Sequence, residues 1–286
     1  MNADRPELVV KNLNVYFGQA GEPVHALRDV SFTAGTGKLG IVGESGSGKS
    51  TLGRAVLRLL PDIARIEADQ MRFGETDLLS ASEKAMLSVR GHRIGMILQD
   101  PKYSLNPTMR VGEQILEAVR LHSRVTHREG REQVLDLLDK VRIRMPRRVY
   151  DLYPHEISGG MGQRVMIATA LAGRPDLIIA DEPTSALDVT VRRQLLELMD
   201  AMILDRGISL ILITHDLDLA GSYCDRVMIM YAGRIVETVA ASELDAVRHP
   251  YSQGLLASAP RLDRVMRRLP VMARAAAWTA PGEAGR

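Results

Sequence analysis

Hydrophobic and polar residues alternate in two stretches near the start of the chain. Residues 8–15 and 24–32 mix β-branched and aromatic residues with polar ones, and a break with turn residues separates them at 18–23. This pattern predicts two half-buried antiparallel strands. Residues 39–42 are short, apolar and followed by a Gly/Ser cluster, which predicts a buried strand that runs into a loop.

Later segments divide into two kinds by the spacing of their apolar residues. Helical spacing is found at residues 51–60 (where Pro61 ends the helix), 111–121, 128–141, 160–172 and 189–204. Short apolar runs that predict strands lie at residues 93–98, 177–180, 208–214 and 226–231. Because buried strands alternate with helices, we expect an α/β fold with a mainly parallel sheet, an antiparallel β subdomain and an inserted helical subdomain at about residues 100–172.

Composition narrows the class of protein. The chain has 286 residues, 45% of them hydrophobic, with 37 Lys and Arg against 35 Asp and Glu. This balance and the low aromatic content of 4% argue against a dedicated nucleic-acid binder. No apolar run is long enough for a membrane span and the first residues do not resemble a signal peptide, so a soluble, cytoplasmic protein is expected.

One glycine-rich segment carries the strongest chemical signal. Gly43-Glu44-Ser45-Gly46-Ser47-Gly48-Lys49-Ser50 fits the phosphate-loop pattern G-x-x-x-x-G-K-[ST], between a predicted strand and a predicted helix. Its glycines let backbone N–H groups and the helix N-terminus approach a phosphate closely. Lys49 adds a positive charge, the Ser50 hydroxyl suits Mg²⁺, and Thr51 can bind a phosphate oxygen. The sequence therefore predicts a nucleotide site.

Two further patterns depend on that loop for their interpretation. Asp181 and Glu182 end an apolar strand, where one carboxylate can hold Mg²⁺ and the other can polarise water, although an ordinary helix start at Pro183 is the alternative. Ser158 precedes Gly159 and Gly160 at a predicted helix start, which is either a second anion site or a simple helix cap.

These motifs and three more resemble, in their order, the nucleotide-binding subunits of ATP-binding-cassette (ABC) transporters. The resemblance spans about residues 8–260 and adds Gln99-Asp100-Pro101, Ser185-Ala186-Leu187-Asp188 and Thr214-His215-Asp216. Segments such as 99–107, 153–156 and 249–256 are similar to the dipeptide, oligopeptide and nickel import branch. The resemblance implies a P-loop ATPase domain over residues 1–260 and leaves 261–286 as a weakly structured or partner-dependent tail.

The family resemblance also implies a role for each matched residue. ATP phosphates and Mg²⁺ would be held by the loop 43–51, with Asp181 and Gln99 also at the metal. Glu182 would be the general base, and His215 would contact the γ-phosphate. Ser158, Gly159 and Gly160 would bind the γ-phosphate of an ATP held on a second subunit, and Asp188 would lie in the loop that joins the two sites. The adenine would stack on Phe17, which we favour over Tyr16 because Leu13, Val15 and Phe17 share one strand face.

The partners implied are a second ABC ATPase subunit, related rather than identical, two integral membrane permease subunits and, indirectly, a solute-binding protein. ATP hydrolysis would then drive import of a peptide, nickel or metal-chelate solute at the cytoplasmic face of the cell membrane. A soluble ABC ATPase module of a non-transport complex has the same motifs and stays open. A P-loop kinase would not need Ser158-Gly159-Gly160 or His215.

Three departures from the family pattern stand out in the chain. The turn at residues 34–38 is about one residue shorter than usual, and Gly162 stands where relatives often carry a large basic residue. Cys224 is the only cysteine, so neither an internal disulfide nor the iron–sulfur cluster of some relatives is expected.

Overall fold

The computed structural model describes residues 5–18, 23–185 and 187–258. It divides into two compact units, Met1–Ser80 with Ile211–Arg286, and Ala81–Leu210. The predicted break between the first two strands falls largely on residues 19–22, and the predicted tail on 261–286, so both lie outside the described residues.

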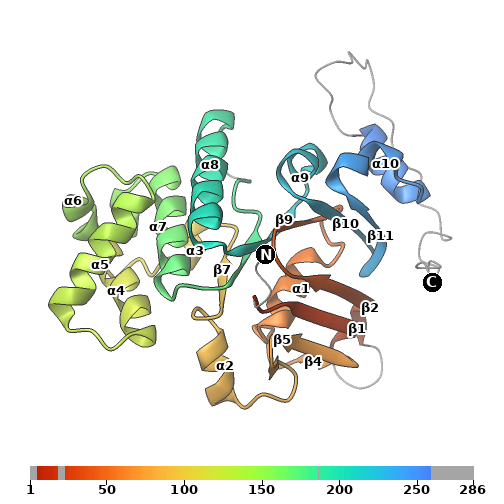
Figure 1. Ribbon diagram of the computed structural model, residues 1–286, viewed down its shortest axis with the longest axis horizontal. Helices are drawn as coiled ribbons and strands as arrows, with labels where there is room; N and C mark the ends of the chain where they lie inside the picture. The colour runs from red at the N-terminus through yellow and green to blue at the C-terminus, as the bar shows by residue number, and fades with distance from the viewer. Residues whose placement is uncertain (1–4, 19–22, 186, 259–286) are drawn as a thin grey trace. The chain divides into compact units, whose positions relative to one another are not determined.

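The first unit contains the predicted antiparallel sheet. Strand β1 (Leu8–Phe17) pairs with β2 (Val24–Ala34) on one side and with β5 (Gln70–Phe73) and β4 (Ala64–Glu67) on the other (Figure 1), and β6 (Thr76–Asp77) pairs with β5. The alternation of the sequence appears as buried Leu13 and Val15 beside half-buried Asn14 and Tyr16.

The same unit holds the strand that enters the phosphate loop. Strand β3 (Lys38–Val42) lies parallel to β10 (Arg226–Tyr231), which pairs antiparallel with β11 (Arg234–Ala240). Helix α1 (Lys49–Val56) follows the loop, and α9 (Leu217–Tyr223), the 3₁₀ helix η2 (Ala241–Ala246) and α10 (Pro250–Ser258) complete the unit. One core cluster joins Val42 to Leu217, Val227, Ile229 and Tyr251.

The second unit combines two parallel strands with a group of helices. Strand β7 (Ile94–Ile97) pairs in parallel with β8 (Leu177–Asp181). Strand β9 (Ser209–Thr214) is buried throughout; it begins in this unit and passes into the first unit at Ile211. The helices are α2 (Glu83–Val89), α3 (Pro101–Ser104), α4 (Val111–His122), α5 (His127–Lys140), α6 (Pro146–Tyr150), the 3₁₀ helix η1 (Pro154–Glu156), α7 (Gly159–Ala172) and α8 (Val189–Arg206).

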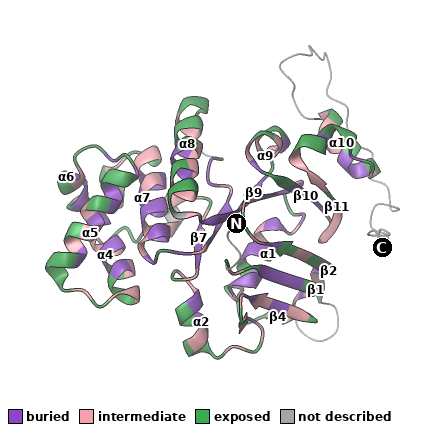
Figure 2. Ribbon diagram, viewed as in Figure 1, coloured by how far each residue is buried: buried purple, intermediate pink, exposed green. Residues whose placement is uncertain are grey.

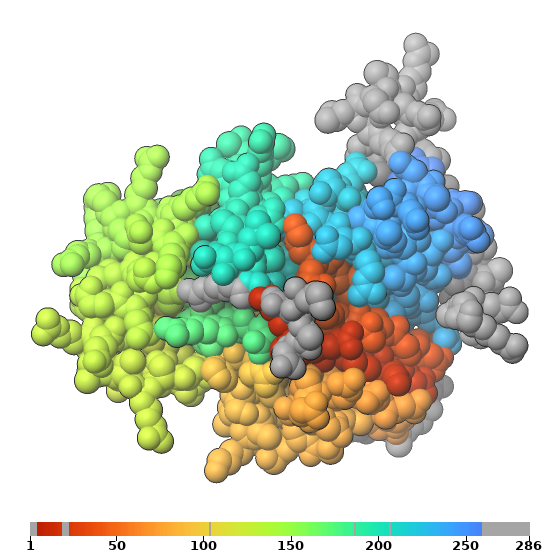
Figure 3. Space-filling view, in the orientation of Figure 1, coloured from red at the N-terminus to blue at the C-terminus, as the bar shows by residue number. Residues whose placement is uncertain are grey.

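Helices α4, α5 and α7 pack against one another and confirm the predicted helical stretches. Figure 2 shows in purple the buried positions of α4 and α7. Ile115 of α4 and Val165 of α7 are fully buried. In Figure 3 side chains of α4–α6, in yellow-green, protrude along the left outline of the view. Among the described residues, none of the helices combines the length and apolar content needed to cross a bilayer.

Helix α1 is shorter than the sequence predicts. It was expected to run to Leu60 before Pro61, but it ends at Val56. Arg58 adopts a left-handed φ of 51°, the Arg58 N–H donates to the Ala55 carbonyl at 3.0 Å, and the Leu59 N–H donates to the Arg54 carbonyl at 2.9 Å. These two bonds form a Schellman motif, so the backbone closes the helix before the proline is reached.

The short turn at residues 34–38 is closed by a distant side chain. The Lys38 N–H donates to Asp225 Oδ2 at 2.7 Å, and a Cβ at Gly37 would lie 2.6 Å from the same oxygen. The turn is therefore held by direct contact with the residue that precedes β10.

Candidate functional site

The phosphate loop wraps around the ammonium group of Lys49. Lys49 Nζ donates to the carbonyl oxygens of Gly43 and Glu44, both at 2.8 Å, and lies 3.4 Å from Ser47 Oγ. Its side chain is buried, with 5% relative exposure. The lysine charge is therefore held at the centre of the loop, close to the backbone N–H groups that would face an anion.

The backbone conformation of the phosphate loop is fixed in part by neighbouring backbone, which leaves no room for a side chain at Gly43. A Cβ at Gly43 would lie 2.2 Å from the Met230 carbonyl oxygen, so only glycine fits there. On the other side of the loop, the Gly233 N–H donates to the Ser47 carbonyl at 3.0 Å. The end of β10 and the turn that follows it thus pack against the phosphate loop and hold its backbone in place.

Helix α1 presents its N-terminus to the loop. Gly48 is the N-cap with a left-handed φ of 104° and no side-chain capping bond, and the first turn contains no acidic residue. Ser50 and Thr51 lie in that turn, half-buried. Because the positive end of the helix dipole and two hydroxyl groups share this position, the geometry suits a phosphate.

The acidic pair ends β8 in an unusual backbone conformation. Asp181 is 1% exposed, and Glu182 adopts a left-handed φ of 47°. A positive φ in a glutamate is a strained conformation of the kind that clusters at functional sites. Gln99, which lies two residues beyond β7, donates from Nε2 to Glu182 Oε2 at 3.2 Å. The structure therefore brings these two predicted catalytic side chains together.

The helix start considered at Pro183 is not observed. A turn follows Glu182, in which the Ser185 N–H and Oγ both donate to the Glu182 carbonyl, at 3.3 and 3.2 Å. The next helix, α8, begins only at Val189, and Asp188 caps it by accepting from the N–H groups of Thr190 and Val191 at 3.0 Å each. The acidic pair is therefore not an ordinary helix N-terminus.

The predicted anion site at Ser158 is a true helix start. Ser158 caps α7, and its Oγ accepts from the Met161 N–H at 3.3 Å. A Cβ added at Gly159 would meet nothing within 4 Å, whereas one at Gly160 would lie 3.2 Å from Val191 Cγ1. The simple cap is thus present, and the bare backbone at Gly159 leaves the helix end accessible.

The next turn of α7 contacts both segments that bear Gln99 and Glu182. Gln163, which is buried, donates from Nε2 to the Pro183 carbonyl. A Cβ at Gly162 would lie 3.1 Å from Pro101 Cβ. In the sequence Gly162 stands out only as a departure from the family pattern and Gln163 gives no signal of its contact, because the spacing along a helix does not reveal which loop packs on it.

His215 and Phe17 lie at strand ends in the first unit. His215 is exposed directly after β9, beside Asp216, whose Oδ1 accepts from the Leu219 N–H at 2.9 Å to cap α9. Phe17 is the half-buried last residue of β1. Among the register shifts between β1 and β2, the one between Val15 and Tyr16 places its extra residue, Ala26, in β2, so Phe17 stays on the side of Val15.

The ring of Tyr16, the alternative to Phe17, is already engaged. It stacks on His25 with centroids 4.3 Å apart, and the Arg65 guanidinium lies 4.7 Å from its centre. Both contacts occupy the faces of the Tyr16 ring on which an adenine would have to stack.

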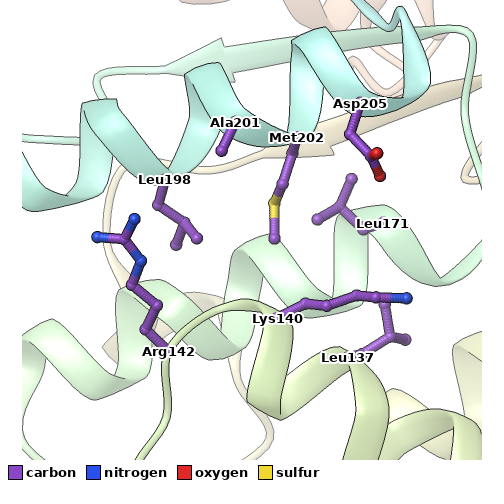
Figure 4. A pocket seen from close by; sticks show the side chains of 8 residues that line it. All are labelled: Leu137, Lys140, Arg142, Leu171, Leu198, Ala201, Met202 and Asp205. Atoms are coloured by element: carbon purple, nitrogen blue, oxygen red, sulfur yellow. The ribbon is translucent and has the colours of Figure 1, made fainter.

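A cavity of about 230 Å³ lies between α5, α7 and α8, away from the predicted site residues (Figure 4). Leu137, Leu171 and Leu198 provide apolar lining, with Lys140, Arg142 and Asp205 among the polar side chains. Lys140 Nζ pairs with Asp136 Oδ2 at 2.6 Å.

Comparison with known proteins gives consistent matches. A family model described as ABC transporter matches residues 27–185. The oligopeptide transport ATP-binding protein OppD of Bacillus subtilis is 48% identical over 259 residues, which cover 90% of this chain and 72% of that protein. The dipeptide transport ATP-binding protein DppD of Haemophilus influenzae is 46% identical over 255 residues, covering 88% and 77%.

Solved structures with the same fold are also ABC cassettes. The dimeric structure of MJ0796, a bacterial ABC transporter cassette, is 25% identical with a TM-score of 0.70, covering 82% of this chain and 98% of that one. The cbiO1 protein from Clostridium perfringens, part of the ABC transporter complex cbiONQ, is 28% identical with a TM-score of 0.69, covering 85% and 92%.

Proposed function

This chain belongs to the ABC transporter family and is an ATPase, and we propose that it energises the import of peptides or related small solutes through separate membrane permease subunits. The observation that carries the proposal is the phosphate loop closed around Lys49, in a chain 48% identical to an oligopeptide transport ATP-binding protein. The relatives reported above are transport ATP-binding proteins, so they do not favour the non-transport alternative.

Within this proposal, the phosphate loop holds the triphosphate of ATP. Lys49 compensates the negative charge of the β- and γ-phosphates, and the Thr51 hydroxyl binds a phosphate oxygen. Ser50, Gln99 and Asp181 offer the hydroxyl, amide and carboxylate oxygens that Mg²⁺ prefers, so the donor set fits this ion. When bound, Mg²⁺ neutralises charge that develops on the phosphate oxygens.

Glu182 acts as the general base that takes a proton from the attacking water. The hydrogen bond from Gln99 supports this role, because an amide donor beside the carboxylate orients it and helps to position the water. His215 contacts the γ-phosphate, and Phe17 stacks on the adenine, since the ring of Tyr16 is engaged by His25 and Arg65.

A second ATPase subunit completes each site. The accessible start of α7 at Ser158, Gly159 and Gly160 supports binding to the γ-phosphate of an ATP held by the partner. Asp188 caps α8 and so shapes the loop that would communicate between the two sites. We propose a related rather than identical partner, by analogy with the import branch that the chain resembles.

The assembly would lie at the cytoplasmic face of the cell membrane, where two permease subunits carry the solute and a binding protein delivers it. The helices between residues 100 and 172 would transmit nucleotide-driven closure to the permeases. Because the solute passes through other subunits, the choice among peptide, nickel and metal-chelate classes is made by them.

One experiment tests the proposal as a whole. The tagged chain is expressed with its chromosomal neighbours, extracted with detergent and purified, and ATP hydrolysis and copurifying proteins are measured. We expect integral membrane subunits to copurify with a second ATPase, and hydrolysis to be lost in Lys49→Ala. A fully active chain that copurifies only with non-membrane proteins would contradict the import function and favour the non-transport alternative.

A further inference from the structure

Helix α10, the last helix of the described residues, reaches the phosphate loop through the Tyr251 side chain. The Glu44 N–H donates to Tyr251 Oη at 3.1 Å, although the two residues are 207 positions apart. The Tyr251 side chain is fully buried, and its ring lies against that of Tyr231, with centroids 4.4 Å apart. A phenol oxygen placed in an apolar cluster is costly without a hydrogen-bond partner, so this contact accounts for a tyrosine at this position.

Both backbone polar groups of Glu44 are held. Its carbonyl accepts from Lys49 Nζ at 2.8 Å, and its N–H is bound by Tyr251. A loop held in this way has less conformational freedom to lose when it closes on a phosphate. Of these two bonds to Glu44, the bond from Lys49 comes from the start of α1, and the bond to Tyr251 comes from a distant part of the chain.

The start of α10 is itself fastened to β11. Glu237 accepts from the Arg248 N–H at 2.6 Å and from the His249 N–H at 3.2 Å, and His249 Nδ1 accepts from the Tyr251 N–H at 3.2 Å. Burial raises the pKa of Tyr251 to about 12, so its hydroxyl stays protonated at neutral pH. The hydroxyl is thus presented from a firmly held helix.

We propose that Tyr251 is a positioning residue for nucleotide binding: its hydroxyl holds the Glu44 amide and so prearranges the phosphate loop for ATP. The inference rests on the proposed role of that loop as the ATP site. It assigns a task to the segment His249-Pro250-Tyr251, which the proposed function does not use. Tyr251 does not touch the reacting atoms, so it acts on ATP affinity and not on the chemical step.

The test compares two tyrosine-to-phenylalanine variants. Tyr251→Phe removes the hydroxyl and keeps the ring, and the matched control Tyr231→Phe removes the hydroxyl of the ring packed against it. The Kd of the full chain for ATP is measured by titration calorimetry, and KM and kcat are measured on the detergent-purified assembly. For Tyr251→Phe we expect Kd and KM to rise about fivefold with kcat unchanged, as befits one lost hydrogen bond.

A second variant removes the attachment of α10 to β11, which holds Tyr251 in place. Glu237→Ala releases the start of α10, and we expect it to raise KM in the same direction as Tyr251→Phe. An unchanged Kd in Tyr251→Phe, an equal loss in Tyr231→Phe, or a lower kcat at constant KM would each overturn the inference. A merely structural role would lower the melting temperature and leave the KM of the folded protein unchanged.

Lys49→Ala separates this inference from the proposed function. If Lys49→Ala abolishes ATP binding and Tyr251→Phe binds like the wild type, the positioning role fails and the loop remains the ATP site. If Lys49→Ala binds ATP with the wild-type Kd, the loop is not the site and both proposals fail.

Discussion

Gln99 and Glu182 lie 83 positions apart in the chain and share a hydrogen bond of 3.2 Å between Nε2 and Oε2. One residue follows the strand β7, and the other follows its parallel neighbour β8. Because parallel strands deliver their carboxyl ends to one edge, the two side chains meet there. The hydrogen bond from Gln99 therefore orients the carboxylate of Glu182, the proposed general base.

Replacing Glu182 with glutamine keeps its shape and removes its basicity. We expect Glu182→Gln to bind ATP, to favour the dimer, and to reduce turnover about 10²- to 10⁴-fold, because a general base contributes on that scale. ATP hydrolysis and size-exclusion chromatography with ATP measure both effects. Unchanged hydrolysis would remove Glu182 from this role.

Gly162 allows Pro101 to approach α7, and so determines where the segment after Gln99 lies. In Gly162→Ala, a helix gain of about 0.5–1 kcal/mol opposes overpacking that costs about 1–3 kcal/mol. We expect a small change in melting temperature and a larger loss of ATPase activity in Gly162→Ala. Gly159→Ala, whose Cβ meets nothing within 4 Å, serves as the control for melting temperature. Full activity in Gly162→Ala would contradict this prediction.

Ser158 combines a capping role with the proposed contact to ATP of a second subunit, and two variants separate them. Ser158→Ala loses the cap bond to Met161, which costs about 1 kcal/mol. Ser158→Asp restores a cap but places a negative charge where the phosphate would bind, so we expect normal stability with turnover reduced more than about tenfold. Thermal unfolding and ATPase assays measure the two effects. Normal turnover in Ser158→Asp would argue against an anion at this helix start.

The stacking role of Phe17 is tested against its neighbour. Phe17→Ala should raise the KM for ATP about tenfold, the scale of one lost base-stacking contact, with kcat little changed. Tyr16→Ala removes the contacts with His25 and Arg65, and should therefore lower the melting temperature while KM stays the same. If Tyr16→Ala raised the KM for ATP and Phe17→Ala did not, Tyr16 and not Phe17 would stack on the adenine.

Tyr251 also predicts a dependence of stability on alkaline pH. Burial raises its pKa from 10.0 to about 12, above the value in the unfolded chain. The stability linked to its protonated form is therefore complete below pH 10.0 and is lost as the pH rises to about 12. We expect the melting temperature of the wild type to fall more steeply over this range than that of Tyr251→Phe. Parallel curves would show that the phenol does not titrate in this way.

Much of the fold follows directly from the local pattern of the sequence. The alternation in β1 and β2, the helical spacing of α4, α5 and α7, and the short buried runs of β7 and β8 all predict the elements observed. Strands such as β4 and β11 lack that signal: Ala64–Glu67 has no buried residue, and Arg234–Ala240 is only partly buried, so their pairing partners stabilise them. The end of α1 was missed because a Schellman motif at Arg58 has no fixed residue signature.

The sequence by itself identified the phosphate loop, because the glycines, Lys49 and Ser50 that define its pattern are contiguous in the chain. It also placed Asp181 and Glu182 at the end of a strand. Only the tertiary structure decided that Gln99 binds Glu182, that Gly162 faces Pro101, and that Tyr251 holds Glu44. Those contacts join segments far apart in the chain, and which segments meet is selected by the packing of the core as a whole.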